Sequence, residues 1–319
     1  MIKITNKKVI LATILALSIA IQVGCSNINN EKGNANGGLS NSGTVVTEEN
    51  KQQNDEKTVI DDFYVLINNN DAMTRVIKFI DNNISLVSEE NASIMVDKLM
   101  ELQKNYLSNL EEKFYVNDIQ QRFLDENKSV SDLNQINSIN DTELKKLLSE
   151  VRENGFKVEA AEGEYFPIID YEFYMKYSSF VTSDNKGYIE IMADESSQIP
   201  AKDAGLVIGW DEVLDRALNQ EKFINEYPDS DKFNDIKTLH KRYVYFLFYG
   251  TDNTPLFSYD TKTFVTDARE AYTKAISNNI ESELLKSLKG FLETLENSEY
   301  KLTKNVEKYR NNVFKNLTK

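Results

Sequence analysis

The 319-residue sequence contains 51 acidic and 37 basic residues, which gives a formal net charge of −14 at pH 7. Such an excess of acid repels phosphate polymers and anionic lipid, so it argues against a protein that binds nucleic acid. With one cysteine and one histidine, the chain excludes an internal disulfide framework and the usual zinc sites, and we expect no metal or other cofactor.

Residues 1–24 have the pattern of an export signal. Three lysines and no acid lie within the first eight residues, and a largely apolar run follows from Val9 to Val23. The run is shorter than the roughly 20 residues that cross a bilayer, which favours a cleaved leader over a permanent transmembrane helix. Gly24 and Cys25 end this run, so the only cysteine of the chain lies at the expected cleavage point.

The basic start, the short apolar run and the Gly24-Cys25 pair resemble the signal peptide and lipobox of bacterial lipoproteins. The resemblance implies that Cys25 is acylated on sulfur, by palmitate or a similar chain, and becomes the first residue of the mature protein. Gln22 departs from the leucine that the family usually has at this position. Two or more acyl chains give stable attachment, so the expected location is the extracytoplasmic face of the cell membrane.

Residues 25–57 predict a flexible tether that carries the lipidated cysteine at its start. The segment is rich in Asn, Gly, Ser, Gln and Glu and contains almost no apolar residue. It cannot bury enough surface to offset the entropy lost on ordering. Fully stretched, such a segment reaches about 110 Å, so the folded part can stand clear of the lipid headgroups.

Residues 58–319 predict a mainly α domain, a helical bundle or an array of helical hairpins with at most a small β-hairpin in the middle. All four prolines lie between residues 156 and 260, and their absence from both flanks is typical of long helices. Three sub-regions, 58–155, 156–209 and 210–319, follow from this change in composition.

The first sub-region predicts four helices. Apolar residues recur at helical spacing over 60–67 and 73–80, and Asn-rich breaks at 68–70 and 82–83 end these two helices. Ser88 begins a longer helix whose apolar face continues to Phe114, and a polar connection covers 133–139. Asp141 begins another helix, which ends at Gly155 in a left-handed conformation.

The middle sub-region leaves two alternatives open. Apolar residues alternate from Phe156 and are followed by Gly163, which predicts either a two-stranded hairpin or an irregular segment that leads into a helix at Tyr171. Residues 186–198 predict a helix, and residues 200–209 predict a buried connector.

The third sub-region begins with the clearest local motif, a helix, a turn and a helix over 210–250. Pro228 ends the first helix, and Asp229 or Ser230 caps the second. The string FINEYPDS resembles the joint between tetratricopeptide-type repeats, but it occurs in one copy and such arrays need about three repeats. We therefore expect a single helical hairpin, followed by further helices from Thr266 onward.

The region 58–319 also resembles a group of uncharacterised lipoproteins from low-GC Gram-positive bacteria. The strings AEGEYFPIIDY, GYIEIMADES, FINEYPDS and YGTDNTP carry this resemblance. No activity is attached to that group, so the resemblance implies no catalytic residue.

Acidic and aromatic side chains gather between residues 159 and 172. Glycosidases use one carboxyl as an acid and a second as a nucleophile or base, and Glu162 and Asp170 are the candidates for these roles. Tyr165 and Tyr171 are candidate platforms for a sugar ring. The alternative is a solvated edge above a packed aromatic core, which the abundance of acids in this chain favours.

The loop 249–259 contains polar residues between aromatic ones. Asp252, Asn253 and Tyr259 are candidate binding residues, because loops on helical scaffolds often bind ligands; the favoured alternative is a plug at the end of a bundle. His240, the only histidine, is expected on a helix surface, since catalysis would require a serine brought close by folding.

These patterns favour a binding protein over an enzyme. The expected partners are the membrane, through the lipid anchor, and an envelope protein or a small extracellular ligand. The alternative is a hydrolase of extracellular glycan that uses carboxylates from 159–172.

Overall fold

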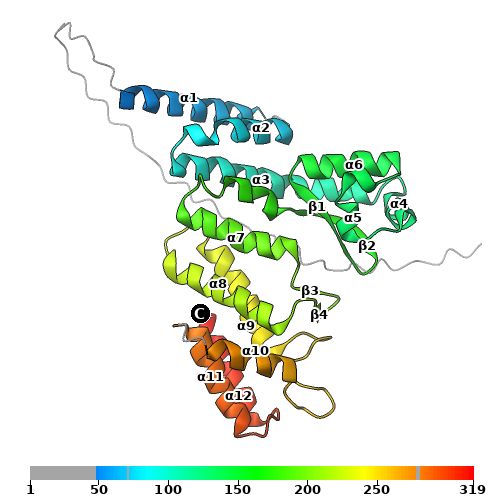
Figure 1. The fold of residues 1–319 in the computed structure, drawn as a ribbon, viewed down its shortest axis with the longest axis vertical. Helices are drawn as coiled ribbons and strands as arrows, with labels where there is room; N and C mark the ends of the chain where they lie inside the picture. Colours follow the sequence, from blue (N-terminus) through cyan, green and yellow to red (C-terminus); the bar gives the residue numbers. More distant parts are fainter. Residues whose placement is uncertain (1–47, 70–71, 278–280) are drawn as a thin grey trace, which may run out of the picture. The chain divides into compact units, whose positions relative to one another are not determined.

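The computed structural model describes residues 48–69, 72–277 and 281–319, with side chains from residue 55 onward. The expected leader, Cys25 and residues 25–47 of the expected tether lie outside the described residues. Helices dominate the described part, which also contains two small antiparallel sheets of two strands each. The predicted mainly α fold is therefore confirmed (Figure 1).

The first helix begins within the segment expected to be a tether. It runs from Glu48, so the prediction of irregular chain up to residue 57 is wrong for 48–57. Glu56 gives one physical reason, because its carboxylate accepts hydrogen bonds of 2.7 Å from Ser88 N and from Asn91 Nδ2. Once residues 58–68 are packed, extending a helix towards its N-terminus costs little, because the nucleus is already formed.

Four helical elements make up the start of the described chain, and both Asn-rich breaks fall as predicted. Ser88 caps the long third helix by accepting a hydrogen bond from Asn91 N at 3.4 Å. The predicted apolar face of this helix is buried at Met95, Leu99 and Phe114. The elements are α1 (Glu48–Asn68), α2 (Met73–Asn83), η1 (Ile84–Leu86) and α3 (Glu89–Phe114).

Two short helices and a turn of 3-10 helix lie in the stretch after Phe114, where no helix was expected. Few buried side chains hold them, notably Ile119, Phe123 and Leu133. Phe123 stacks on Phe114 with ring centroids 5.5 Å apart. So few apolar positions cannot produce a visible helical period. The elements are α4 (Ile119–Glu126), α5 (Val130–Leu133) and η2 (Ile136–Ser138).

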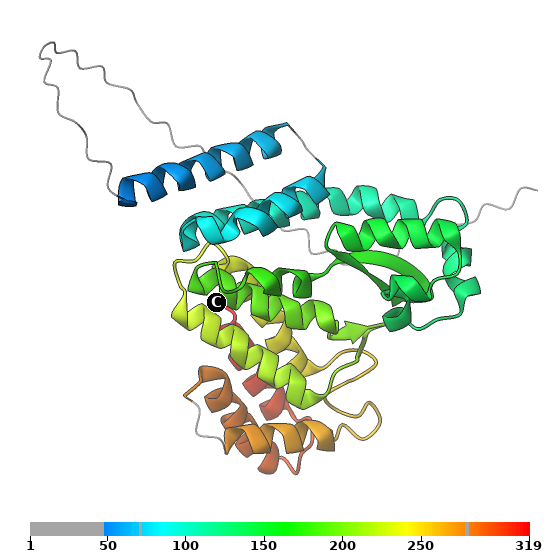
Figure 2. The same cartoon turned by 45° about the horizontal axis from the view of Figure 1, so that its top comes forward.

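A helix and a β-hairpin follow, as Figure 2 shows in green. Asp141 caps α6 (Thr142–Glu153) by accepting a hydrogen bond from Leu144 N at 2.8 Å. Gly155 then takes the predicted left-handed conformation, with φ +73°. The antiparallel strands β1 (Phe156–Ala161) and β2 (Glu164–Ile169) follow.

The turn between β1 and β2 decides between the two alternatives left open for this segment. Glu162 and Gly163 both have positive φ, +53° and +81°, which is the backbone of the two-residue turns that match the twist of a hairpin. Phe156 pairs with Ile169 at one end and Ala161 with Glu164 at the other. The segment is therefore a regular hairpin.

The expected buried connector at 200–209 is wrong in part. It contains a second small hairpin, and its turn residues Asp203 and Ala204 are exposed. Both have positive φ, +49° and +56°, and no glycine signals the turn at these two positions. The elements of this part are η3 (Tyr171–Tyr177), α7 (Ser183–Ser197), β3 (Ala201–Lys202) and β4 (Gly205–Leu206).

The last part contains the predicted helical hairpin and three further helices. The second helix of the hairpin begins at Phe233 without a side-chain cap, so the predicted cap at Asp229 or Ser230 is wrong. Ser230 instead donates to Asp184 Oδ2 at 2.6 Å and accepts from Lys232 N at 3.2 Å. The elements are α8 (Trp210–Glu226), α9 (Phe233–Tyr249), α10 (Thr266–Ile276), α11 (Glu283–Glu296) and α12 (Lys304–Leu317).

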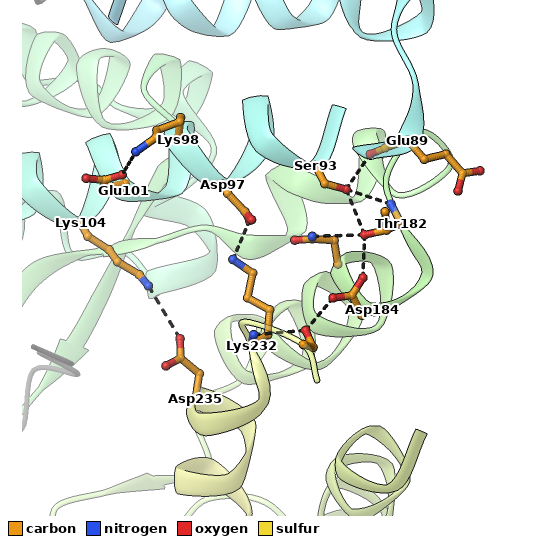
Figure 3. A network of polar contacts seen from close by, with 12 residues as sticks. Glu89, Ser93, Asp97, Lys98, Glu101, Lys104, Thr182, Asp184, Lys232 and Asp235 are labelled. Carbon is orange, nitrogen blue, oxygen red and sulfur yellow. Dashed lines mark hydrogen bonds and ion pairs between the residues drawn. The ribbon is translucent and has the colours of Figure 1, made fainter. Parts of the chain in front are cut away.

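The described residues belong to one compact unit, which runs from Val46 to Lys319. Polar contacts between α3, the start of α7 and residues 230–235 cross this unit (Figure 3). Thr182 N donates to Ser93 Oγ at 2.9 Å, and the Thr182 hydroxyl donates to Asp184 at 2.6 Å. Lys232 forms an ion pair of 2.6 Å with Asp97. The Ser93–Thr182 and Asp97–Lys232 contacts each hold together segments that are more than 80 residues apart in the chain.

A second buried contact fixes the end of α6 against α3. The fully buried Gln103 donates through Nε2 to the carbonyl oxygens of Asn154 and Gly155, at 2.7 and 3.3 Å. Its Oε1 accepts a hydrogen bond of 2.6 Å from the hydroxyl of Tyr174. Buried polar groups are stable when they are paired in this way, so Gln103 determines how closely α3 approaches the start of the first hairpin.

Candidate functional site

The two carboxylates predicted as a glycosidase pair lie at opposite ends of the first hairpin. Glu162 is exposed in the turn, and Asp170 follows the far end of β2. Six residues of extended strand separate their positions by about 20 Å. Glycosidases hold their two carboxyl groups about 5–10 Å apart, so the structure does not bring this pair together.

Tyr165 belongs to an aromatic stack rather than to a free platform. Its ring lies parallel to that of Phe123, with centroids 4.5 Å apart. Gln120 fixes the backbone of Tyr165 on both sides, accepting from its N–H at 2.9 Å and donating to its carbonyl oxygen at 2.7 Å. One face of the ring is thus covered by Phe123, and the side chain as a whole is half-buried.

Tyr171 is buried among other aromatic rings. Burial raises the pKa of its hydroxyl to about 12, and its ring packs edge-on against Tyr188 with centroids 6.3 Å apart. A side chain that is only 7% exposed cannot present a face to a sugar. In this part of the segment the structure favours the packed aromatic core over the binding platform.

The loop 249–259 packs on the second hairpin. Asn253 uses both of its nitrogens for this contact: its backbone N–H donates to Ala204 O at 2.8 Å, and Nδ2 donates to Asp203 O. The hydroxyl of Tyr259 donates to the carbonyl oxygen of Asp252 at 2.8 Å. The carboxylate of Asp252 is exposed. These bonds occupy the Nδ2 of Asn253 and the hydroxyl of Tyr259, which favours the packing role.

A pocket of about 240 Å³ lies beside the first hairpin and includes one of the predicted residues, Asp170. Its apolar lining comes from α5, η2, α6 and β1. Its polar lining comes from Asn134 after α5, from residues on either side of the Gly155 turn, and from residues after β2. None of the residues that line it belongs to the loop 249–259. The lining residues are Leu133, Asn134, Ile136, Leu148, Val151, Arg152, Phe156, Lys157, Asp170 and Glu172.

The two basic side chains of this pocket, Lys157 and Arg152, differ in whether they have acidic partners. Lys157 Nζ lies 3.2 Å from Asp170 Oδ1 and 3.5 Å from Glu172 Oε2, so one ammonium group is shared by two carboxylates. Arg152 is exposed and forms no ion pair with any described residue. A guanidinium group presents several N–H donors in a plane that matches a carboxylate or phosphate. The pocket therefore offers an anion-binding group beside an apolar floor.

Sequence reasoning identified Asp170 but missed Arg152 and Lys157. These two residues lie three before and two after Gly155, and the reversal of the chain at this glycine places both on the pocket. The sequence signal for the reversal is Gly155 itself, because its φ of +73° is unfavourable for other residues. The spacing of Arg152 and Lys157 in the sequence matches no motif that would single them out.

His240 is buried, so the expectation of a surface histidine is wrong. Its exposed fraction is 5%, and burial lowers the pKa of its imidazole. Glu221, also buried, partly offsets this shift. His240 lies one turn after Ile236 and one turn before Val244, which are both buried, so the helical period places it on the buried face of α9. The expectation of a surface position relied on the polarity of the imidazole rather than on this spacing.

A cluster of charged side chains around the buried Arg216 was also not predicted. Arg216 lies 2.7 Å from Glu212 and 3.6 Å from Glu195, and Tyr243 donates its hydroxyl to Glu195. Burial raises the pKa of the Glu195 carboxyl although Tyr243 and Arg216 oppose the shift. The members of this cluster come from α7, α8 and α9, so it connects the helical hairpin to α7.

Within the described ranges, no group of three or more His, Cys, Asp or Glu side chains is placed to hold a metal ion. The same part of the chain has no helix that is both long and apolar enough to cross a bilayer. No protein-family model, curated protein or solved structure matches this chain. Any functional assignment therefore depends on the residues themselves.

Proposed function

We propose that this chain is a lipid-anchored protein of the extracytoplasmic face whose helical domain binds a small ligand. The observation that carries the location is the Gly24-Cys25 pair directly after a basic start and a short apolar run. An exported chain with a single cysteine has no internal disulfide to form. Acylation gives that thiol a role that agrees with its position.

The pocket beside the first hairpin supports the binding role. Its volume of about 240 Å³ suits a ligand of amino-acid size, slightly below the range of drug-sized pockets. Arg152 offers its guanidinium to an anionic group, while Leu148, Val151 and Phe156 cover the apolar part. The proposed ligand class is a small molecule with a carboxylate and an apolar body, such as an amino acid or a short peptide.

Mass spectrometry and fractionation test the proposed anchor. Native protein extracted with detergent is expected to begin at Cys25 and to carry the mass of two or more acyl chains. A Cys25→Ala variant is expected to leave the membrane fraction, and Ser26→Ala is the matched control that should remain there. An unmodified thiol, or a Cys25→Ala variant that stays in the membrane fraction, would overturn the assignment.

A further inference from the structure

The last helix carries charge of the opposite sign to the chain as a whole. Residues 301–319 contain six basic residues and one acid, in a chain of net charge −14. Lys304, Lys308 and Lys315 are spaced by four and seven residues, so they lie within about 40° of one another around α12. Lys319 continues this row just after the helix.

The lysine row is free to meet a partner. All four side chains are exposed, and none forms an ion pair with a residue that the structure describes. The one acid of the segment, Glu307, is exposed on the same helix and is likewise not in an ion pair with a described residue. The row from Lys304 to Lys315 extends about 16 Å along the helix axis at 1.5 Å per residue.

Aromatic rings pack where α12 meets α9, and Phe314 lies about 80–120° around α12 from the lysine row. Tyr245 and Tyr249 stack with centroids 4.8 Å apart, and Phe314 of α12 meets both rings edge-on, at 6.0 and 5.7 Å. Tyr245 is 48% exposed, and Tyr249 and Phe314 are half-buried. The guanidinium of Arg310 lies 4.6 Å from the Tyr249 ring centre and has no carboxylate partner among the described residues.

Long basic side chains beside half-exposed tyrosines are the combination that peripheral proteins use at the boundary of headgroups and acyl chains. The ammonium groups meet lipid phosphates, and the amphipathic rings lie at the interface. The chain outside the structure also argues for a membrane as the partner. The 22 residues between Cys25 and Glu48 reach at most about 75 Å, so a lipid anchor would keep the domain near the bilayer.

We infer that the α9–α12 face, formed by Tyr245, Tyr249, Lys304, Lys308, Phe314 and Lys315, binds the anionic headgroups of a membrane. The acidic remainder of the chain is repelled by the same surface, so the contact orients the domain (α9 and α12 in Figure 1). The biological setting rests on the proposed lipid anchor. The contact itself is tested without that anchor, so the two proposals can fail separately.

The test uses the chain from Ser26 to Lys319, which lacks the leader and Cys25 and retains the whole compact unit. Sedimentation measures its binding to vesicles of phosphatidylglycerol and phosphatidylcholine in equal parts, and to vesicles of phosphatidylcholine alone. We expect binding only to the anionic vesicles, and a decline of that binding as salt is added. The triple variant Lys304→Gln, Lys308→Gln, Lys315→Gln is expected to bind at least about tenfold more weakly.

A matched triple variant, Lys78→Gln, Lys146→Gln, Lys222→Gln, removes the same charge from exposed lysines on α2, α6 and α8. We expect it to bind like the parent chain, and Tyr245→Ala to weaken binding without loss of helix content. The inference is overturned if the parent does not bind anionic vesicles at low salt. It is also overturned if both triple variants weaken binding equally, or if the parent binds soluble polyphosphate and not the vesicles.

Discussion

Gly155→Ala is expected to destabilise the protein by about 2–5 kcal/mol through two separable effects. Alanine at φ +73° occupies a left-handed conformation, which costs about 1–2 kcal/mol. The added Cβ would lie 2.4 Å from Gln103 Nε2, so the amide must move. Its hydrogen bonds to Asn154 O and Gly155 O are then lost in a buried site, at a further cost of about 1–3 kcal/mol.

Gly163→Ala is the matched control for the backbone effect. Gly163 has a similar φ of +81°, and no atom lies within 4 Å of the position of an added Cβ. We therefore expect only the backbone cost of about 1–2 kcal/mol there. Urea unfolding followed by circular dichroism and by the fluorescence of the single, buried Trp210 gives the two free energies of unfolding.

A double variant with Gln103→Ala separates the steric clash from the backbone cost of alanine at positive φ. If the clash is real, Gly155→Ala should cost less in the Gln103→Ala background than in the parent, because the displaced amide is absent. Equal losses for Gly155→Ala and Gly163→Ala, together with additivity in the double variant, would refute the argument that Gln103 approaches Gly155 closely.

Two further predictions concern ligand binding and acid stability. Arg152→Gln is expected to weaken binding of amino acids or short peptides at least about tenfold in calorimetry, while Lys146→Gln, on the same helix, leaves it unchanged; equal effects would remove the pocket from consideration. The pKa of the Glu126 carboxyl is lowered, mainly by the backbone N–H of Asp141. The ionised carboxylate thus stabilises the folded state above its unfolded pKa, and this contribution is lost as pH falls through the folded pKa. Between about pH 5 and pH 3, the melting temperature of Glu126→Gln should therefore fall less than that of the parent. Parallel plots of melting temperature against pH for the two proteins would contradict this account.

Local chemistry explains which parts of the fold could be predicted. Ser88 and Asp141 cap helices through hydrogen bonds to residues three positions away, so the signal and the structure are in the same short segment. Gly163 marks its turn in the same way. Asp203 and Ala204 carry no such mark, because contacts with Asn253, about 50 residues later, support their positive φ values. Propensity alone cannot reveal a turn that depends on a distant loop.

The candidate sites show the same contrast between features that a short segment reveals and features that depend on the fold. Acids and aromatic residues between 159 and 172 are visible as a cluster, but the strand direction separates Glu162 from Asp170 and only folding brings Arg152 near the latter. The basic last segment is hard to recognise in the sequence for another reason. A net charge averaged over the whole chain hides a local excess of lysine, although the count of charges in residues 301–319 is available from the sequence.

The second hairpin is too small to be stable by itself. Its strands have two residues each, and its pairing is supported from two sides: Lys202 forms an ion pair with Glu159 of the first hairpin, and Leu206 N donates to Thr254 of the loop at 3.0 Å. Its local unfolding should thus be coupled to both neighbours. In amide hydrogen exchange, loss of either the Lys202–Glu159 ion pair or the Leu206–Thr254 hydrogen bond would speed exchange at the Leu206 amide. The exchange rate of this one amide therefore reports on the contacts of the second hairpin with both the β1–β2 hairpin and the segment after α9.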